Sequence, residues 1–296
     1  MTHVEHWVAI VFDTSITWLE NAVLLKAATG FEFAEGAAWH PDGFFLFSDT
    51  PANKIYRLDT DGRCEVYLDN SGWTGDGGNQ LSDQVGSNGI VIDGDNLFIC
   101  QHGNHAIAQL DTQKKLLTLI QEYDGHPFNS PNDLIMRSDG TLFFTDPPYG
   151  LAGQVLHPEQ FQLVAGVYQY RNGVTMRIGT QLQYPNGLLL SEDEKYLFVS
   201  SNHPDDPGIV MYHTKADGYI RYEGVFLNLH ADGMTRGNDG HIYLATDEGV
   251  LVVNPEGSKL ALLPLPESSS NLCWGGMQRD ILLVTARTSV YFIIKS

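Results

Sequence analysis

The sequence predicts an all-β fold, a six-bladed β-propeller, because one short pattern occurs six times along its 296 residues. In each copy a polar residue precedes a short apolar strand, a turn and a second apolar strand, and glycine follows the polar residue in four copies. The polar residues occur every 39 to 54 positions, at Glu35, Asn88, Asn132, Asn186, Asp232 and Asn271. Such a period is typical of propeller blades.

The first two strands of each unit are expected to form a hairpin. The connecting turns read Asp-Gly in four units, at residues 42–43, 93–94, 139–140 and 239–240, with residues 191–195 in the fourth unit. The second strands, for example 142–145, are rich in aromatic and β-branched residues. A third strand follows in several units, as at 249–253, so each unit is a meander and not a βαβ crossover.

The last unit is too short for four strands, because only 25 residues follow Asn271. We therefore expect the N-terminal extension, residues 1–30, to supply its outer strand from about Ala22 to Ala28. Residues 1–296 then form a single six-bladed propeller domain in which the N-terminal strand closes the last blade. A β-sandwich is the alternative, but it does not require six units in register.

The composition excludes several classes of partner. Asp and Glu number 36 against 17 Lys and Arg, and the net charge of −19 opposes binding to nucleic acid or to anionic membranes. The apolar run at residues 7–12 is too short to cross a membrane and lacks the flanks of a signal peptide. Three cysteines without CxxC spacing indicate neither a disulfide framework nor a zinc cluster. We expect a cytoplasmic protein, and the oligomeric state stays open.

The six polar residues are candidates for one shared site. The first strand of each propeller blade lines the central channel, so residues that begin those strands converge at one end of it. A single Asn-Gly pair more often forms a turn, but six polar residues in one register favour a site. Two carboxylates and four amides in a narrow channel would repel or lack partners unless a cation bound them. Oxygen ligands favour Ca²⁺ or Mg²⁺, and leave Mn²⁺, Zn²⁺ and Fe²⁺ open.

Several local motifs accompany these polar residues, namely Glu35-Gly36 with Trp39, Gln101-His102-Gly103-Asn104, Ser130-Pro131-Asn132-Asp133-Leu134, Pro185-Asn186-Gly187 and Asp232-Gly233. They resemble the SMP-30/gluconolactonase family of propeller lactonases, and the resemblance extends from about Phe33 to the C-terminus. The segment at 143–150, which ends Asp-Pro-Pro-Tyr-Gly, is similar to bacterial gluconolactonases in particular.

The resemblance implies a metal-dependent hydrolase of small lactones. One divalent ion would be held by four ligands, Glu35, Asn132, Asn186 and Asp232. Asp232 would also be the general acid/base, although by physics alone Glu35 could accept the proton equally well. Asn132 is either a ligand or a substrate contact. Three further candidates for substrate binding are Asn88, His102 and Tyr149.

Two positions depart from the family pattern and concern specificity. Ser130 and Gln101 stand where some members carry an arginine, so cationic contacts to the substrate are missing there. The long segment 71–86 is either a lid over the channel or a flexible insertion.

Two other functions fit the same residues. A phosphotriesterase-type hydrolase would use the same metal site, and a non-catalytic propeller would only bind a ligand. The sequence contains no GxSxG, P-loop, GxGxxG or HExxH motif, so serine hydrolase, nucleotide-binding and zincin functions are not indicated.

Overall fold

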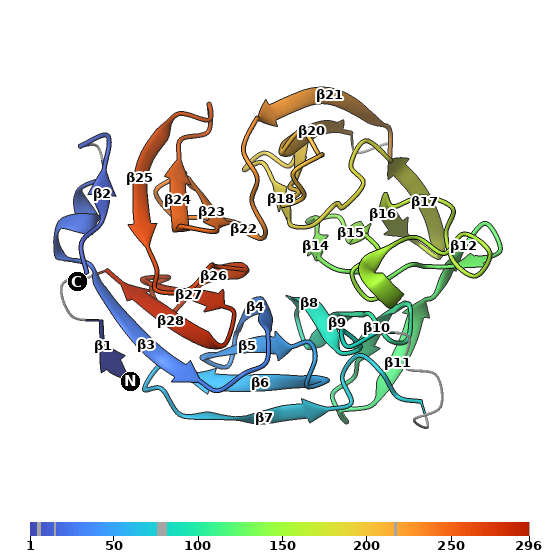
Figure 1. Cartoon of the computed structure of the whole chain (residues 1–296), viewed down its shortest axis with the longest axis horizontal. Coiled ribbons are helices and arrows are strands. Elements are labelled where there is room, and N and C mark those ends of the chain that lie inside the picture. Colours follow the sequence, from blue (N-terminus) through green and yellow to red (C-terminus); the bar gives the residue numbers. More distant parts are fainter. Residues whose placement is uncertain (5–6, 15, 76–81, 216–217, 296) are drawn as a thin grey trace.

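A computed structural model describes residues 1–4, 7–14, 16–75, 82–215 and 218–295. Viewed down the short axis, six antiparallel sheets surround a central channel (Figure 1). The helical elements in the described part of the chain are the short 3-10 turns η1 (Thr17–Asn21) and η2 (Ala152–Gln154). The predicted six-bladed propeller is confirmed.

Each blade begins with its channel-lining strand, as the repeated pattern predicted. Blade 1 contains β4 (Ala34–His40), β5 (Phe44–Asp49), β6 (Lys54–Asp59) and β7 (Cys64–Asp69). Blade 2 contains β8 (Ser87–Asp93), β9 (Asn96–Gln101), β10 (Ala106–Leu110) and β11 (Leu116–Ile120). Blade 3 contains β14 (Leu134–Met136), β15 (Leu142–Asp146), β16 (Gly166–Arg171) and β17 (Val174–Gly179).

The remaining blades follow the same order. Blade 4 contains β18 (Leu188–Leu190), β19 (Tyr196–Val199), β20 (Ile209–Thr214) and β21 (Ile220–Leu227). Blade 5 contains β22 (Met234–Arg236), β23 (Ile242–Thr246), β24 (Gly249–Val253) and β25 (Lys259–Pro264). Blade 6 contains β26 (Asn271–Gly275), β27 (Ile281–Ala286) and β28 (Ser289–Ile294). A small hairpin, β12 (Glu122–Tyr123) and β13 (His126–Pro127), lies between blades 2 and 3 in sequence.

The N-terminal segment closes the ring. β3 (Val23–Thr29) pairs antiparallel with β28, one residue from the predicted position, so the prediction of a closing strand is confirmed. Beyond it, β1 (Thr2–His3) adds a fifth strand to blade 6 and β2 (Ile10–Val11) adds one to blade 5. The indole Nε1 of Trp7 also donates to the carbonyl of Pro264 at 2.7 Å. The two chain ends therefore lie on the same side of the ring (Figure 1).

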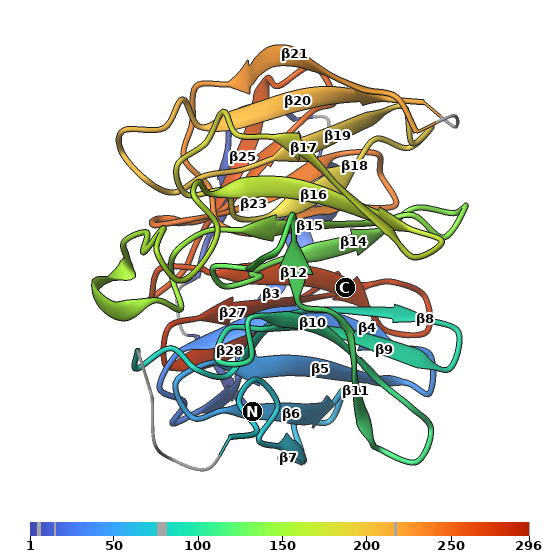
Figure 2. The same cartoon turned by 90° about the vertical axis from the view of Figure 1, so that its right-hand side faces the viewer.

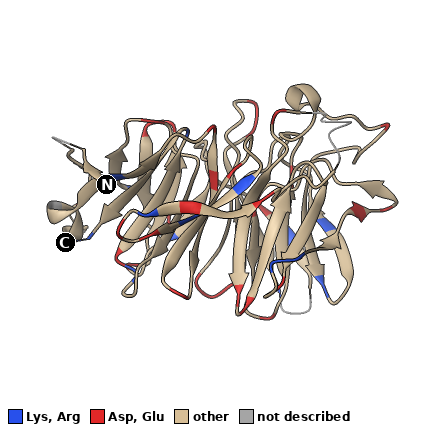
Figure 3. Ribbon diagram, turned by 90° about the horizontal axis from the view of Figure 1, so that it is seen from below, with Lys and Arg blue, Asp and Glu red and all other residues tan. Residues whose placement is uncertain are grey.

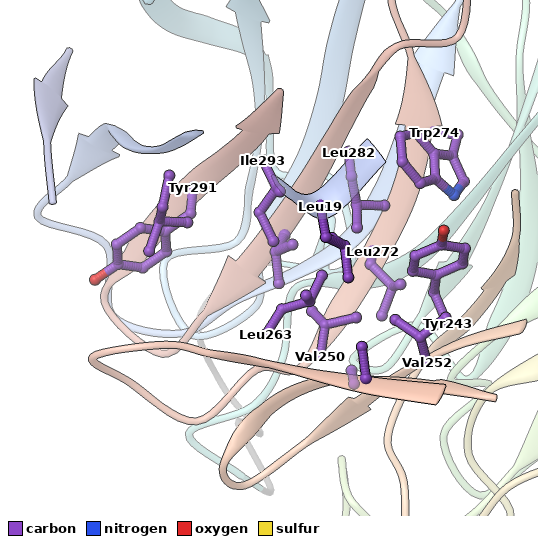
Figure 4. Close-up of a cluster of buried hydrophobic side chains, with 14 of the residues drawn as sticks. Leu19, Tyr243, Val250, Val252, Leu263, Leu272, Trp274, Leu282, Tyr291 and Ile293 are labelled. Atoms are coloured by element: carbon purple, nitrogen blue, oxygen red, sulfur yellow. The ribbon is translucent and has the colours of Figure 1, made fainter. Parts of the chain in front are cut away.

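A hydrophobic cluster fills the joint between blades 5 and 6, where the ring is closed (Figure 4). Tyr243 and Trp274 meet edge to face at 5.1 Å between ring centroids, and Leu19 of η1 packs into the same cluster. Fully burying one such large apolar side chain contributes about 1.5–3 kcal/mol. The N-terminal segment is thus held by packing as well as by strand pairing.

The glycines that follow the polar residues are explained by close packing of the inner strands, which contact one another in a closed ring. A Cβ atom on Gly36 would lie 1.9 Å from the carbonyl oxygen of Asn88, and one on Gly187 would lie 2.4 Å from that of Asp232. Any larger residue would push neighbouring blades apart. The Gly residues of the motif thus make the channel narrow.

Loop lengths make one end of the channel asymmetric. The loops that join the second and third strands are long in blades 3 and 4, and the blade 3 loop projects from one face (Figure 2). In blades 5 and 6 the corresponding connections are two-residue turns, Asp247–Glu248 and Arg287–Thr288. A ligand at this end of the channel would therefore face the long loops of blades 3 and 4 on one side and the short turns of blades 5 and 6 on the other.

The surface agrees with the acidic composition. In the view of Figure 3, Asp and Glu occur in loops at both ends of the blades and outnumber Lys and Arg. Cys64, Cys100 and Cys273 are free thiols. Among the described residues no helix has the length and apolar character needed to cross a membrane.

Candidate active site

A polar pocket of about 270 Å³ lies at the asymmetric end of the channel. It brings together all seven side chains predicted to form the site, Glu35, Asn88, His102, Asn132, Tyr149, Asn186 and Asp232. The sixth residue of the repeated pattern, Asn271, does not line the pocket, and its Oδ1 instead accepts the N–H of Leu272 at 2.8 Å.

Three of the predicted ligands occupy equivalent positions in successive blades. The backbone N–H of Asn132 donates to the carbonyl of Thr145, that of Asn186 to Ser200, and that of Asp232 to Ala245, all at 2.8–2.9 Å. Each of these acceptors lies in or directly after the second strand of the same blade. The repeated fold therefore directs the three side chains to the same end of the channel.

Two buried oxygens in this pocket lack a hydrogen-bond partner among the described residues, Oδ1 of Asn132 and Oδ1 of Asp232. A buried polar atom without a partner costs about 1–3 kcal/mol. Each of the two side chains is nevertheless held by its other polar atom, so neither can simply rotate away.

His102 holds the amide of Asn132. The ring is buried, and its Nε2 lies 3.4 Å from Nδ2 of Asn132 while its Nδ1 lies 3.2 Å from the carbonyl of Gln84. Since an amide nitrogen only donates, Nε2 must be the acceptor and Nδ1 must carry the proton. Burial lowers the pKa of His102 to about 4, which keeps this neutral form at neutral pH.

Asp232 is held by a chain of two hydrogen bonds. The hydroxyl of Tyr149 donates to Oδ1 of Asn202 at 2.6 Å, and Nδ2 of Asn202 donates to Oδ2 of Asp232 at 3.1 Å. Tyr149 thus forms part of the pocket wall and also fixes the carboxylate. Asn202 was not predicted, although it follows the second strand of blade 4 as His102 follows that of blade 2.

Three carboxyl groups interact at the pocket, since Glu35 and Asp232 line it and Asp133 acts on both. Burial, together with the charge of Asp133, raises the pKa of Asp232 to about 7. Burial raises the pKa of Asp133 to about 6. The pKa of Glu35 is raised well above its usual value by burial and then by Asp232. Such a cluster favours a cation that would return these groups to their ionised form.

The donor set fits a hard divalent cation. Glu35 and Asp232 supply carboxylates, and Asn132 and Asn186 supply amide carbonyls, which are the ligands that such ions prefer. The part of the chain that the structure describes contains no metal-binding group of three or more His, Cys, Asp or Glu. A metal at this position would therefore depend on the two asparagines.

Five lining residues were not predicted from the sequence, namely Phe33, Gln84, Gln154, Asn202 and Arg287. Gln84 belongs to the segment 71–86, and its carbonyl accepts from Nδ1 of His102 at 3.2 Å. Residues 76–81, six of the sixteen residues in this predicted lid or insertion, lie outside the described residues.

Ser130 and Gln101, the two departures from the family pattern, form hydrogen bonds within the protein. The hydroxyl of Ser130 donates to the carbonyl of Pro147 and accepts the N–H of Gly150. The amide of Gln101 donates to the carbonyl of Ser71 at 2.7 Å. Both side chains are buried and neither lines the pocket. A ligand contact at these positions is therefore absent.

The sequence model described as SMP-30/Gluconolactonase/LRE-like region matches residues 33–288. The chain belongs to this family. A gluconolactonase of Zymomonas mobilis is 29% identical over 280 residues, which cover 89% of this chain and 79% of the relative. Lactonohydrolase oryL of Aspergillus oryzae is 26% identical over 203 residues, which cover 60% of this chain and 46% of the relative.

Comparison with solved structures also finds a gluconolactonase of similar fold. The gluconolactonase of Xanthomonas campestris superposes with a TM-score of 0.87 at 25% identity, covering 100% of this chain and 97% of that one. The family predicted from the motifs is therefore confirmed.

Proposed function

We propose that this chain is a lactonase that opens small sugar lactones of the gluconolactone type with the help of one divalent metal ion. The gluconolactonase and lactonohydrolase relatives support the reaction class. One observation carries the proposal for the site, namely the pair of unpartnered buried oxygens on Asn132 and Asp232. They border the same pocket as the carboxylate of Glu35.

Four residues would hold the ion, Glu35, Asn132, Asn186 and Asp232, and their oxygen donors favour Ca²⁺. Such an ion, when bound, polarises an ester carbonyl and lowers the pKa of a bound water. Asn202 keeps Oδ2 of Asp232 in place, and His102 does the same for the amide of Asn132. The ligands are thus oriented before any ion arrives.

Asp232 is the better candidate for the base. The amide of Asn202 holds its Oδ2, and its Oδ1 has no hydrogen-bond partner among the described residues. Glu35 is the second carboxylate of the pocket, and its pKa is raised by burial and then by Asp232 and Asp133. The carboxylate of Asp232 is therefore oriented with a free oxygen that can accept a proton from the attacking water.

The other lining side chains would bind the substrate. Asn88, His102 and Tyr149 are polar groups around a pocket of about 270 Å³, which is small for a ligand site and suits a single sugar ring. His102 is uncharged at neutral pH, so we assign it to binding and orientation.

The test combines elemental analysis of the purified protein with a pH-indicator assay on five- and six-carbon aldonolactones. We expect one divalent ion per chain and ring opening that stops after chelation. A fully metallated protein that hydrolyses a phosphotriester but no lactone would replace the proposal by the phosphotriesterase alternative. Stoichiometric metal with no turnover of either ester would indicate a binding propeller.

A further inference from the structure

Arg287 is the one cationic side chain among the described residues that line the pocket. It is the first residue of the two-residue turn between β27 and β28, on the side of the pocket entrance that is formed by short turns. Its side chain is exposed, and it lines the pocket together with Asp232. The turn therefore places a positive charge beside a site that otherwise carries carboxylates and neutral polar groups.

The turn that carries Arg287 is fixed on several sides. The carbonyl of Arg287 accepts the N–H of Ala34, the residue before Glu35, at 2.8 Å. The N–H and the hydroxyl of Thr288 both donate to Glu267, at 3.0 and 2.8 Å. Arg287 itself has φ +49°, a left-handed conformation that is uncommon for a residue other than glycine. These contacts hold the backbone in a conformation that costs free energy, so the turn from which the side chain extends is fixed.

The guanidinium group is oriented but has free donors. Its central carbon lies 5.2 Å from the ring centre of Phe33, which also lines the pocket. It makes no hydrogen bond to any described residue, so its N–H groups are available to a ligand. An arginine that stacks on an aromatic ring and keeps its planar fork open is suited to bind a carboxylate or a phosphate.

A second, polar pocket of about 100 Å³ adjoins the first at this point. The two share Phe33, Asn202, Asp232 and Arg287, and the second extends over blades 5 and 6 to His230 and Ser268. The exposed Asp247 lies on its rim. The hollow at the active site is therefore longer than one sugar ring requires, and Arg287 lies where the two parts meet.

We propose that Arg287 binds an anionic substituent of the substrate, so that the enzyme prefers sugar lactones bearing a carboxylate or a phosphate over neutral aldonolactones. This inference rests on the proposed lactonase function. A protein of net charge −19 repels anions, and selection for an acidic substrate therefore requires a local cation. Arg287 supplies it from blade 6, whereas Gln101 and Ser130 contribute no cation to the pocket.

The experiment compares three lactones with the same ring, one neutral, one with a terminal carboxylate and one with a terminal phosphate. Wild type is measured beside Arg287→Gln, Arg287→Lys and the control Arg221→Gln, which removes an arginine from the outer strand of blade 4. Losing a charge-assisted hydrogen bond corresponds to roughly tenfold or more in KM for the anionic lactones. We expect this rise in Arg287→Gln for the anionic lactones only, with any change in kcat shared equally by all three lactones, a smaller rise in Arg287→Lys and none in Arg221→Gln.

A second readout is independent of turnover. The ring-opened dicarboxylate and the ring-opened phosphate are titrated calorimetrically into wild type and Arg287→Gln, and only wild type should bind tightly. The anion that binds more tightly identifies the natural substituent. If Arg287→Gln raises KM equally for neutral and anionic lactones, or if wild type prefers the neutral one, the inference is wrong although the lactonase proposal stands. If no lactone is opened, the proposed function itself fails.

Discussion

The carboxylate of Asp133 joins two neighbouring blades, because its Oδ2 accepts the backbone N–H of Leu188 at 2.9 Å. Its Oδ1 accepts the N–H of Leu134 at the same distance. Asp133 follows the predicted ligand Asn132, and Leu188 lies two positions after the ligand Asn186. A single side chain thus sets the separation of two ligands and adds negative charge beneath them.

Replacing Asp133 by Asn tests this bridge. An amide offers one acceptor, so one of the two backbone N–H groups would face an NH₂ group and lose its partner. We expect a loss of about 1–3 kcal/mol in the free energy of unfolding, measured by urea denaturation. Asp95→Asn, at an exposed turn of blade 2, is the control and should change little. Equal stability of Asp133→Asn and wild type would contradict the bridging role.

The role of His102 gives a second prediction. Because its Nε2 accepts from Asn132, His102→Gln retains a polar group whereas His102→Leu leaves the amide free to turn. We expect His102→Leu to weaken metal binding by roughly tenfold or more, as loss of a residue that orients a ligand typically does, and His102→Gln to weaken it less. The affinity for the metal is measured by titrating the ion into each variant in a calorimeter. Unchanged affinity in His102→Leu would show that His102 contacts only the substrate.

The dependence of activity on pH should show no titration of His102. With a pKa of about 4 it remains neutral from pH 5 upward, so no change in activity near pH 6.5 should depend on it.

The closing strand leads to a third prediction. Deleting residues 1–30 removes β3, exposes the edge of β28 and opens the cluster between blades 5 and 6. We expect aggregation or loss of cooperative melting, because an open propeller exposes long unpaired edges. Deleting residues 1–12 removes β1 and β2 but retains β3, and should lower the melting temperature only moderately. A 1–30 deletion that melted like wild type would disprove closure by this segment.

How far the sequence predicted these features depends on whether they repeat. The blade order, the closing strand and the residues that begin the inner strands follow from a periodic pattern, and the structure places Glu35, Asn132, Asn186 and Asp232 around one pocket. Asn202 and Arg287 lie in loops that differ in length between blades, so no register marks them. The sequence pattern assigned the polar residue of each Asn-Gly pair to a site but gave the glycine no packing role, whereas at Gly187 a Cβ atom would collide with the next blade.

The buried carboxyl groups predict opposite pH responses with and without metal. In the metal-free protein the pKa of Asp232 is raised to about 7 and that of Glu35 is also raised, so the folded state binds more protons than the unfolded state. Their contribution to stability is full below the unfolded pKa of about 4 and is lost as pH rises through about 7. We therefore expect the chelated protein to melt lower at pH 8 than at pH 5.

Metal should reverse this trend, because a divalent ion binds the ionised carboxylates and stabilises the folded state more as protons leave. Melting temperature recorded from pH 5 to 8, with chelator and with Ca²⁺, checks both directions. Glu35→Gln removes one of the titrating groups and should flatten the curve of the chelated protein. Parallel curves with and without metal would contradict a metal site on these carboxylates.

The last prediction separates the two roles given to Asp232. Asp232→Asn keeps the shape of the side chain and an oxygen that can bind metal, but it removes the charge and the proton acceptor. Loss of a general base typically lowers the rate by about 10²–10⁴-fold, or roughly 3–5 kcal/mol in activation free energy. Weaker metal binding would add to this loss, so kcat must be compared at saturating metal, where occupancy is restored.

Under those conditions we expect kcat of Asp232→Asn on an aldonolactone to remain at least about a hundredfold below wild type. Asn202→Leu is the matched variant, because it leaves the carboxylate but removes the hydrogen bond to Oδ2. Its kcat should fall less than that of Asp232→Asn, since the base is still present but less well oriented. If saturating metal returned Asp232→Asn to near wild-type turnover, Asp232 would be a ligand only, and Glu35 would be the remaining carboxylate in the pocket able to accept the proton.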